Sequence, residues 1–244
     1  MKSNILQDHG ALCSLYKSHT GDKEGFDDGD FRSEGDSPSF LHNIETGLRN
    51  MESPDYGGWG GRYVRIRENI WLDPVADSLY EYPTGRWYGN SAWGRQRLRE
   101  QIPSDTLLLD YLKPIWRWAD AFQNDFASRA DWCVKSFDEA NHPPVVKLKN
   151  ELTIYTKPGS IIQLNAKGTY DPDGDKLTYT WWFYKEPGSF KGDIEIENLN
   201  NQKASVRIPA DIGENETIHI VCEVKDDGVP QLTRYKRIII EVKP

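Results

Sequence analysis

The chain has 244 residues, of which 37% are hydrophobic and 12% aromatic, and its formal net charge is −8. Enough apolar residues are present to build packed cores, which excludes a wholly disordered chain. The acidic balance argues against nucleic acid or an anionic membrane as the main partner, because both require a basic face. The sequence also lacks any run of about eighteen apolar residues that would span a membrane.

The N-terminal region carries little structural signal. Residues 1–35 are polar and rich in Gly and Asp, and no periodic apolar pattern precedes Phe40 and Leu41. The first eight residues hold one positive charge and no apolar core, so we expect no signal peptide in this chain. Residues 52–105 place aromatic side chains among Gly and Pro, which is typical of long ordered loops.

One amphipathic helix is predicted next, and Pro114 suits its first position. Apolar residues recur on one face at steps of three and four: Ala119, Phe122, Phe126, Ala130, Cys133 or Val134, and Phe137. The other face carries polar residues: Asp120, Asn124, Asp125, Ser128, Arg129 and Asp131. The helix is expected to end near Ala140, because Pro143 and Pro144 follow it. We therefore place a domain boundary between residues 140 and 141.

After this linker the apolar period changes to two. Five segments are predicted to be short strands, with turn residues between them: 160–166, 177–184, 204–208, 217–224 and 233–242. So many short strands in about a hundred residues indicate an antiparallel β-sandwich. Trp181 and Cys222 are predicted to meet in its core, like the centre of an immunoglobulin domain without the disulfide.

Several long motifs connect the chain to a known family. In the C-terminal part they are Ala140–Pro144, Asp171–Asp175, Leu177–Trp182 and Val224–Pro230, and upstream they are Glu34–Leu41, Trp59–Tyr63 and Trp116–Phe126. The first set closely resembles the C-terminal domain of Sde182-type cellulose-binding proteins, and the second resembles the end of the nucleoside-hydrolase-like domain in that family. The resemblance implies a multi-domain chain. An incomplete α/β, nucleoside-hydrolase-like segment spans residues 1–140, and an all-β immunoglobulin-like sandwich spans residues 141–244.

The resemblance also implies part of a hydrolase site. The nucleoside-hydrolase fold opens with an Asp-rich strand whose carboxylates bind calcium, and this ion activates the attacking water. No such strand is recognisable in this chain, so we expect no independent catalysis. The resemblance places Asp36 as the last metal-binding aspartate, with a turn or a helix N-cap as the alternative. His9 is a candidate for the same pocket, and a plain loop residue is the alternative.

Two further candidate sites lie in the sandwich. Asp171, Asp173 and Asp175 alternate in one turn, an arrangement that suits calcium, and an Asx turn is the alternative. An EF-hand is excluded, because the twelfth position of such a loop would be Trp182 instead of Glu. Trp182 and Tyr184 face away from the predicted core and suit stacking on sugar rings. The alternative for this pair is packing against the upstream segment.

These observations leave three functional hypotheses. The first is a polysaccharide-binding accessory protein, which the family resemblance supports and for which it implies an extracellular or periplasmic location. The second is an N-glycosidic hydrolase of the nucleoside type, of which this chain holds the distal portion. The third treats the sandwich as a structural module that stabilises the hydrolase-like part. The missing N-terminal part of the same domain is a further candidate partner.

Overall fold

The computed structural model describes residues 37–72 and 113–243. The chain divides into two compact units: one holds the chain up to Ile44 together with Asn50–Ala140, and the other holds Glu45–Arg49 together with Asn141–Pro244. A unit boundary thus falls between Ala140 and Asn141. Residues 45–49 belong to the second unit although they lie far upstream in the sequence. No helix in the described ranges is long and apolar enough to cross a membrane.

The first unit contains short elements and one longer helix. These are α3 (Ser37–His42), η1 (Pro54–Tyr56), β1 (Val64–Arg67), β2 (Ile70–Leu72), α6 (Ala119–Trp132) and η4 (Phe137–Glu139). Strands β1 and β2 pair antiparallel, and Asn69 between them has a φ of +57°, which a turn Asn tolerates. The prediction of a continuous loop over residues 52–105 is therefore wrong at this hairpin. Residues 73–105 lie outside the described ranges.

Helix α6 is shorter than predicted, and only part of its predicted apolar face is buried: Phe122 is buried as expected. Phe126, Val134 and Phe137 were expected among the apolar face, and all three are exposed. Asp125, Ser128 and Asp131 are buried instead. Ion pairs hold both carboxylates: Asp125 pairs with Arg129 of the same helix at 2.6 Å, and Asp131 pairs with Lys135, just beyond the helix end, at 3.1 Å. A carboxylate can be buried when it is paired in this way, and the spacing of apolar residues cannot predict such burial. The helix ends at Trp132, and a Ser136–Glu139 capping box then starts η4.

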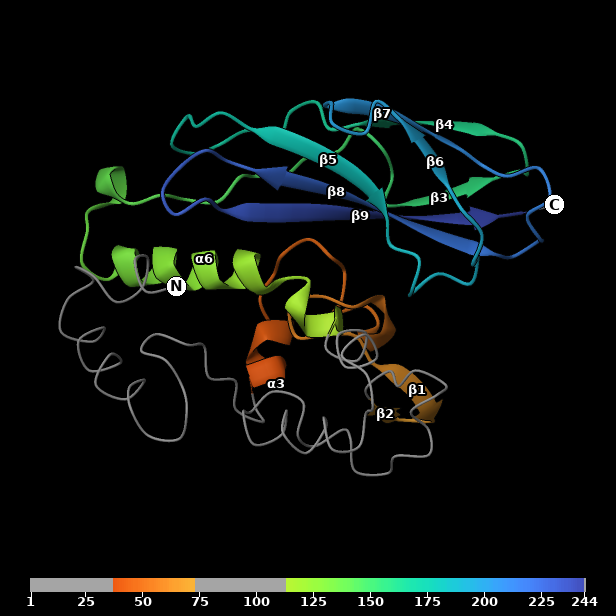
Figure 1. Cartoon of the computed structure of the whole chain (residues 1–244), viewed down its shortest axis with the longest axis horizontal. Coiled ribbons are helices and arrows are strands. Elements are labelled where there is room, and N and C mark those ends of the chain that lie inside the picture. Colours follow the sequence, from red (N-terminus) through yellow and green to blue (C-terminus); the bar gives the residue numbers. More distant parts are fainter. Residues whose placement is uncertain (1–36, 73–112, 244) are drawn as a thin grey trace, which may run out of the picture. The chain divides into compact units, whose positions relative to one another are not determined.

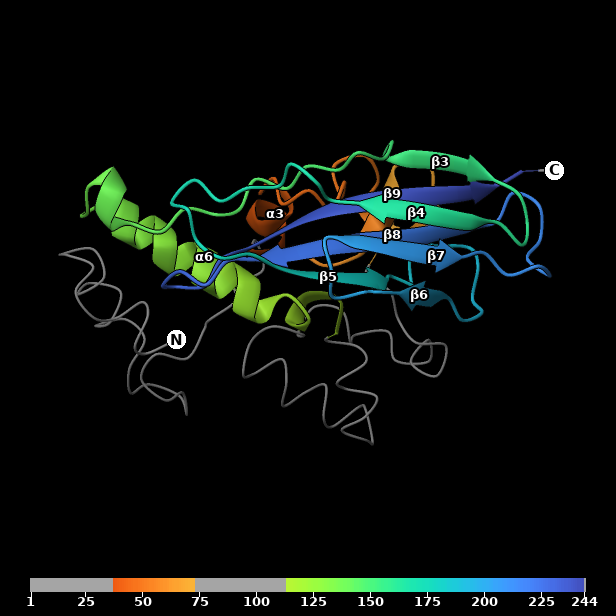
Figure 2. The same cartoon turned by 90° about the horizontal axis from the view of Figure 1, so that it is seen from above.

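The second unit is the predicted sandwich, antiparallel except where its first strand, residues 153–156, pairs in parallel with its last, residues 233–242 (Figures 1 and 2). Its strands are β3 (Thr153–Thr156), β4 (Ile161–Asn165), β5 (Thr178–Phe183), β6 (Glu195–Glu197), β7 (Lys203–Arg207), β8 (Thr217–Lys225) and β9 (Thr233–Val242). One sheet has the order β3-β9-β8-β5 and the other β4-β7-β6. All five predicted strands are confirmed. Strands β3 and β6, of four and three residues, were missed.

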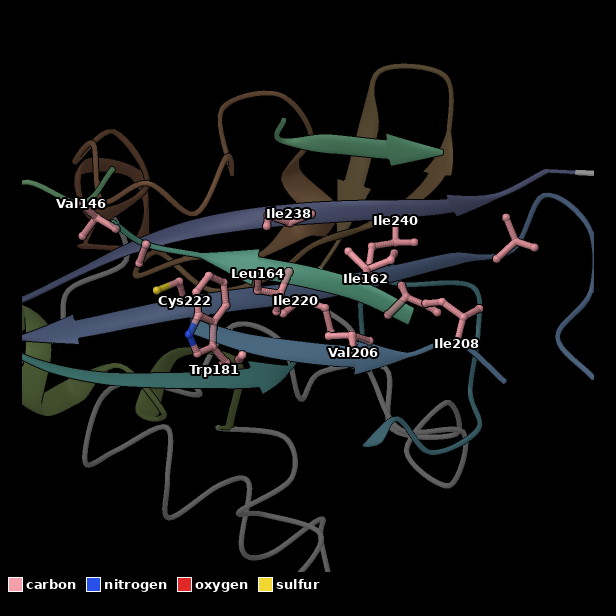
Figure 3. Close-up of a cluster of buried hydrophobic side chains, with 14 of the residues drawn as sticks. Val146, Ile162, Leu164, Trp181, Val206, Ile208, Ile220, Cys222, Ile238 and Ile240 are labelled. Atoms are coloured by element: carbon pink, nitrogen blue, oxygen red, sulfur yellow. The ribbon is translucent and has the colours of Figure 1, made fainter. Parts of the chain in front are cut away.

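The core lies between the two sheets, as Figure 3 shows. Inward-facing residues of β4 and β7, such as Leu164 and Val206, meet Ile220 and Ile238 of the larger sheet. Trp181 of β5 stands directly opposite Cys222 of β8, and both side chains are buried. The predicted pairing of Trp181 with Cys222 is confirmed. This core fixes the register of the strands, and the register in turn positions the loops at both ends of the sandwich.

Candidate functional site

The turn after Tyr170 brings three carboxylates together. Ligand oxygens of Asp171, Asp173 and Asp175 all lie within 4.8 Å of one another. The backbone N–H groups of Asp173 and Asp175 donate to Asp171 Oδ1 at 2.9 and 3.3 Å, so the turn is also an Asx-type turn. Asp171 Oδ2 is buried and accepts no hydrogen bond from the described part of the chain. The two sequence interpretations, a self-bonded turn and a converging acidic cluster, are therefore compatible.

A second acidic loop is tied to this turn. Asp227 Oδ1 accepts the backbone N–H of Lys176 at 2.8 Å. Asp226 is 1% exposed, and its Oδ1 accepts the N–H of Leu232 at 2.8 Å. Burial raises the pKa of Asp226 to about 6 although the Leu232 hydrogen bond lowers it, and the charge of Asp171 raises it further. Burial, followed by the charges of Asp171, Asp227 and Asp173, also raises the pKa of Asp175.

The start of the sandwich unit closes over the same end. Asn141 Nδ2 donates to Pro230 O at 2.8 Å and to Asp226 Oδ2 at 3.3 Å. The backbone N–H of His142 donates to Asp173 Oδ2 at 2.6 Å, and His142 Nδ1 lies 3.0 Å from Asp173 Oδ1. We call Asp171, Asp173, Asp175, Asp226 and Asp227 the acidic end. Beyond the effect of burial, neighbouring carboxylates raise the pKa values of Asp175 and Asp226, and a bound cation would relieve that repulsion.

The two aromatic candidates do not form an exposed platform. Trp182 and Tyr184 lie side by side, with ring centroids 5.3 Å apart and an interplanar angle of 44°. Tyr184 is only 1% exposed, so no face of its ring is open for a sugar. The expectation of a solvent-facing Tyr184 is therefore corrected. The fully buried Arg237 lies with its guanidinium carbon 5.1 Å from the Tyr184 ring centroid, which is a cation–π geometry.

His219 completes this second cluster, and sequence patterns carried no signal for it. Its Nδ1 lies 3.5 Å from Arg237 Nη1. Burial lowers the pKa of His219 to about 3, and the charges of Arg237, Arg49 and Lys191 lower it further. His219 is therefore neutral at any ordinary pH. It lies on the face of β8 opposite the sandwich core, where the period-two pattern showed a polar residue without showing that it is buried.

The hydrolase-type candidates of the first unit lie mostly beyond the described ranges. Asp36 and His9 both fall outside them. The described residues next to Asp36 form α3, which packs closely on Gly60: a Cβ there would lie 2.3 Å from Pro38 O. His42 ends this helix, and burial lowers its pKa. Trp59, the neighbour of Gly60 in the sequence, is buried, so it is a packing residue.

Two family models match the chain. Residues 161–242 match the C-terminal domain of cellulose-binding protein Sde0182. Residues 1–63 match the nucleoside hydrolase-like domain of cellulose-binding Sde182. The family resemblance stated from the sequence is thereby confirmed. No curated protein matches the chain.

One of the similar solved structures aligns with nearly the whole chain. It is a nucleoside hydrolase-related hypothetical protein from Saccharophagus degradans that is associated with carbohydrate metabolism, at 28% identity and a TM-score of 0.69. The alignment covers 99% of this chain and 53% of that one, so this chain spans about half of that protein's length. A PKD domain, at 17% identity and covering 40% of this chain and 86% of its own, has a TM-score of 0.30, too low to carry an argument.

Proposed function

We propose that the chain, a relative of the Sde182-type cellulose-binding proteins, is the C-terminal portion of a polysaccharide-binding accessory protein. The match of residues 161–242 carries this proposal, because it spans β4 to β9 and so most of the sandwich. A cellulose-like polymer is the proposed ligand. An extracellular or periplasmic location follows from that ligand, since such polymers are not found inside the cell.

We assign the polysaccharide contact to the loop that begins with Tyr170. This ring is exposed, and its backbone is held by a β-bridge to Val145. Lys147 Nζ lies 5.1 Å from the Tyr170 ring centroid, which orders the side chain. Aromatic rings that are ordered and exposed stack on sugar rings, and the neighbouring carboxylates accept hydrogen bonds from sugar hydroxyls. Tyr170 thus takes the role that the sequence pattern suggested for Trp182 and Tyr184.

The chain offers a matched control for this assignment. Tyr155 is also exposed and also has a lysine near its ring, with Lys243 Nζ 5.4 Å from the centroid, but it lies on β3. We expect Tyr170→Ala to weaken retention on insoluble cellulose about tenfold, and Tyr155→Ala to leave it unchanged. Both substitutions should change the free energy of unfolding by less than about 0.5 kcal/mol. Equal retention of the two variants would refute the assignment to Tyr170.

We further propose that the acidic end binds calcium. Three observations support this: the converging oxygens of Asp171, Asp173 and Asp175, the buried Asp171 Oδ2, and the raised pKa of Asp175. Calcium takes six to eight oxygens, so Asp226, Asp227, backbone carbonyls or water would have to supply the others. The ion would brace the loop that follows Tyr170. The proposed role of the ion is to stabilise this loop, and no catalytic role is assigned to it.

Calcium binding is tested by thermal unfolding with and without the ion. At a calcium concentration about one hundred times Kd, the free energy of unfolding should rise by roughly 2.7 kcal/mol. Asp175→Asn should abolish this rise. Asp193→Asn, which removes a fully exposed carboxylate elsewhere, should preserve it. If calcium stabilises neither the parent chain nor the Asp193→Asn variant, the acidic end is a self-bonded turn only.

The alternative function is N-glycosidic hydrolysis by a complete nucleoside-hydrolase-like domain. It is supported by the match of residues 1–63 to the nucleoside hydrolase-like model. A complete domain would be the catalyst, and a segment that supplies the metal-binding carboxylates would be the partner of this chain. Chelator-sensitive release of ribose by the purified chain alone would favour this alternative and overturn our expectation that the chain has no independent activity.

A further inference from the structure

The edge of β9 is occupied by a segment from far upstream, Glu45–Arg49, which we call the edge segment. The backbone N–H of Tyr235 donates to Thr46 O at 2.9 Å, and that of Arg237 donates to Gly47 O at 3.2 Å. The next N–H on this edge, of Ile239, is accepted by Leu152 O at 2.9 Å, just before β3 begins. The edge segment therefore continues the hydrogen bonding of β9 beyond the point that β3 reaches.

The edge segment is not a strand but is fitted closely to the edge. Gly47 has a φ of +90° and Arg49 a φ of +58°. A Cβ on Gly47 would lie 1.9 Å from Tyr235 O, so only glycine allows this approach. Leu48 is fully buried and Thr46 is 2% exposed. Arg49 donates from Nη1 to Leu152 O and from Nη2 to Thr153 Oγ1 at 3.3 Å, which joins the segment to the start of β3.

We propose that the β9 edge at Tyr235–Arg237 is a peptide-binding site for which the edge segment is the cognate ligand. An unfilled edge would leave two backbone donors without acceptors and would expose a template for aggregation. Recognition combines main-chain hydrogen bonds, a glycine that permits contact, a buried Leu and an Arg clamp, in the manner of other peptides that bind sheet edges. The segment falls within residues 1–63, the match to the hydrolase-like model, yet it completes the sandwich.

The site is tested in the full chain by amide hydrogen exchange at Tyr235 and Arg237. We expect both amides to be protected in the parent chain. Gly47→Ala should speed their exchange at least tenfold. Gly168→Ala is the matched control, because Gly168 has a φ of +102° and an added Cβ would meet nothing within 4 Å. This control should leave both amides protected. If Gly47→Ala fails to fold, Arg49→Ala should give a smaller loss of protection at the same two amides.

Adding the edge segment as a separate peptide shows whether the β9 edge binds this sequence or contacts it only because both belong to one chain. A synthetic peptide of residues 43–51, added to the Gly47→Ala chain, should restore protection at Tyr235 and Arg237. The same peptide with alanine in place of Gly47 should not. Fast exchange of both amides in the parent chain would overturn the proposal. So would the failure of the parent peptide to restore protection, because the segment would then be held by chain connectivity alone.

Discussion

At the scale of single residues, two buried titratable groups make opposite contributions to the pH dependence of stability. Burial raises the pKa of Asp226 from 3.8 to about 6. Its favourable contribution to the free energy of unfolding is therefore complete below pH 3.8 and is lost as pH rises through 6. Burial lowers the pKa of His219 from 6.5 to about 3, so its contribution is complete above 6.5 and is lost as pH falls. Between these limits the two effects oppose each other, and the parent chain shows only their difference.

Two substitutions separate these contributions. For Asp226→Asn, the free energy of unfolding relative to the parent should increase as pH rises from about 4 to about 7, because the cost of ionising a buried carboxyl is removed. For His219→Gln, the relative free energy should increase as pH falls over the same range. Urea unfolding at a series of pH values measures both slopes. Profiles that run parallel to the parent profile would contradict the assigned pKa shifts.

At the scale of elements, the sequence predicts those strands whose apolar residues recur on one face. Strands β4, β5, β7, β8 and β9 carry enough apolar signal to be located, and the Trp181–Cys222 contact follows from the register of β5 with β8. Strands β3 and β6 were not predicted, because four and three residues show too little apolar periodicity. The convergence of Asp171, Asp173 and Asp175 is local and was predictable. The burial of Tyr184 was not, because it depends on residues distant in sequence, Arg237 among them.

Helix α6 shows a second limit of sequence patterns, and it leads to a prediction. Part of the apolar stripe is exposed and part of the polar stripe buried, unlike an ordinary amphipathic helix. Val134→Ser should therefore change the free energy of unfolding by less than about 0.5 kcal/mol. Ser128→Leu, which enlarges a fully buried side chain, should cost about 1–3 kcal/mol. Chemical unfolding compares the two variants. A larger loss of unfolding free energy for Val134→Ser than for Ser128→Leu would mean that the face predicted from apolar spacing is the buried one.

At the scale of the whole molecule, the limits of the matched domains and those of the compact units differ. The hydrolase-like match runs through residues 45–49, whereas these residues belong to the sandwich unit. The chain therefore passes between the units after Ile44, Arg49 and Ala140. A sandwich cut at residue 141 would lack the acceptors of Tyr235 and Arg237. We expect a segment of residues 141–244 to be less stable to urea than the same sandwich in the full chain, and equal stability would contradict this.

We propose that this chain binds a cellulose-like polymer through its sandwich. The decisive test is depletion of the purified full chain from solution by insoluble cellulose. We expect saturable depletion that Tyr170→Ala weakens and Tyr155→Ala does not. A chain that stays in solution at every cellulose concentration, with its cooperative unfolding intact, would contradict the claim.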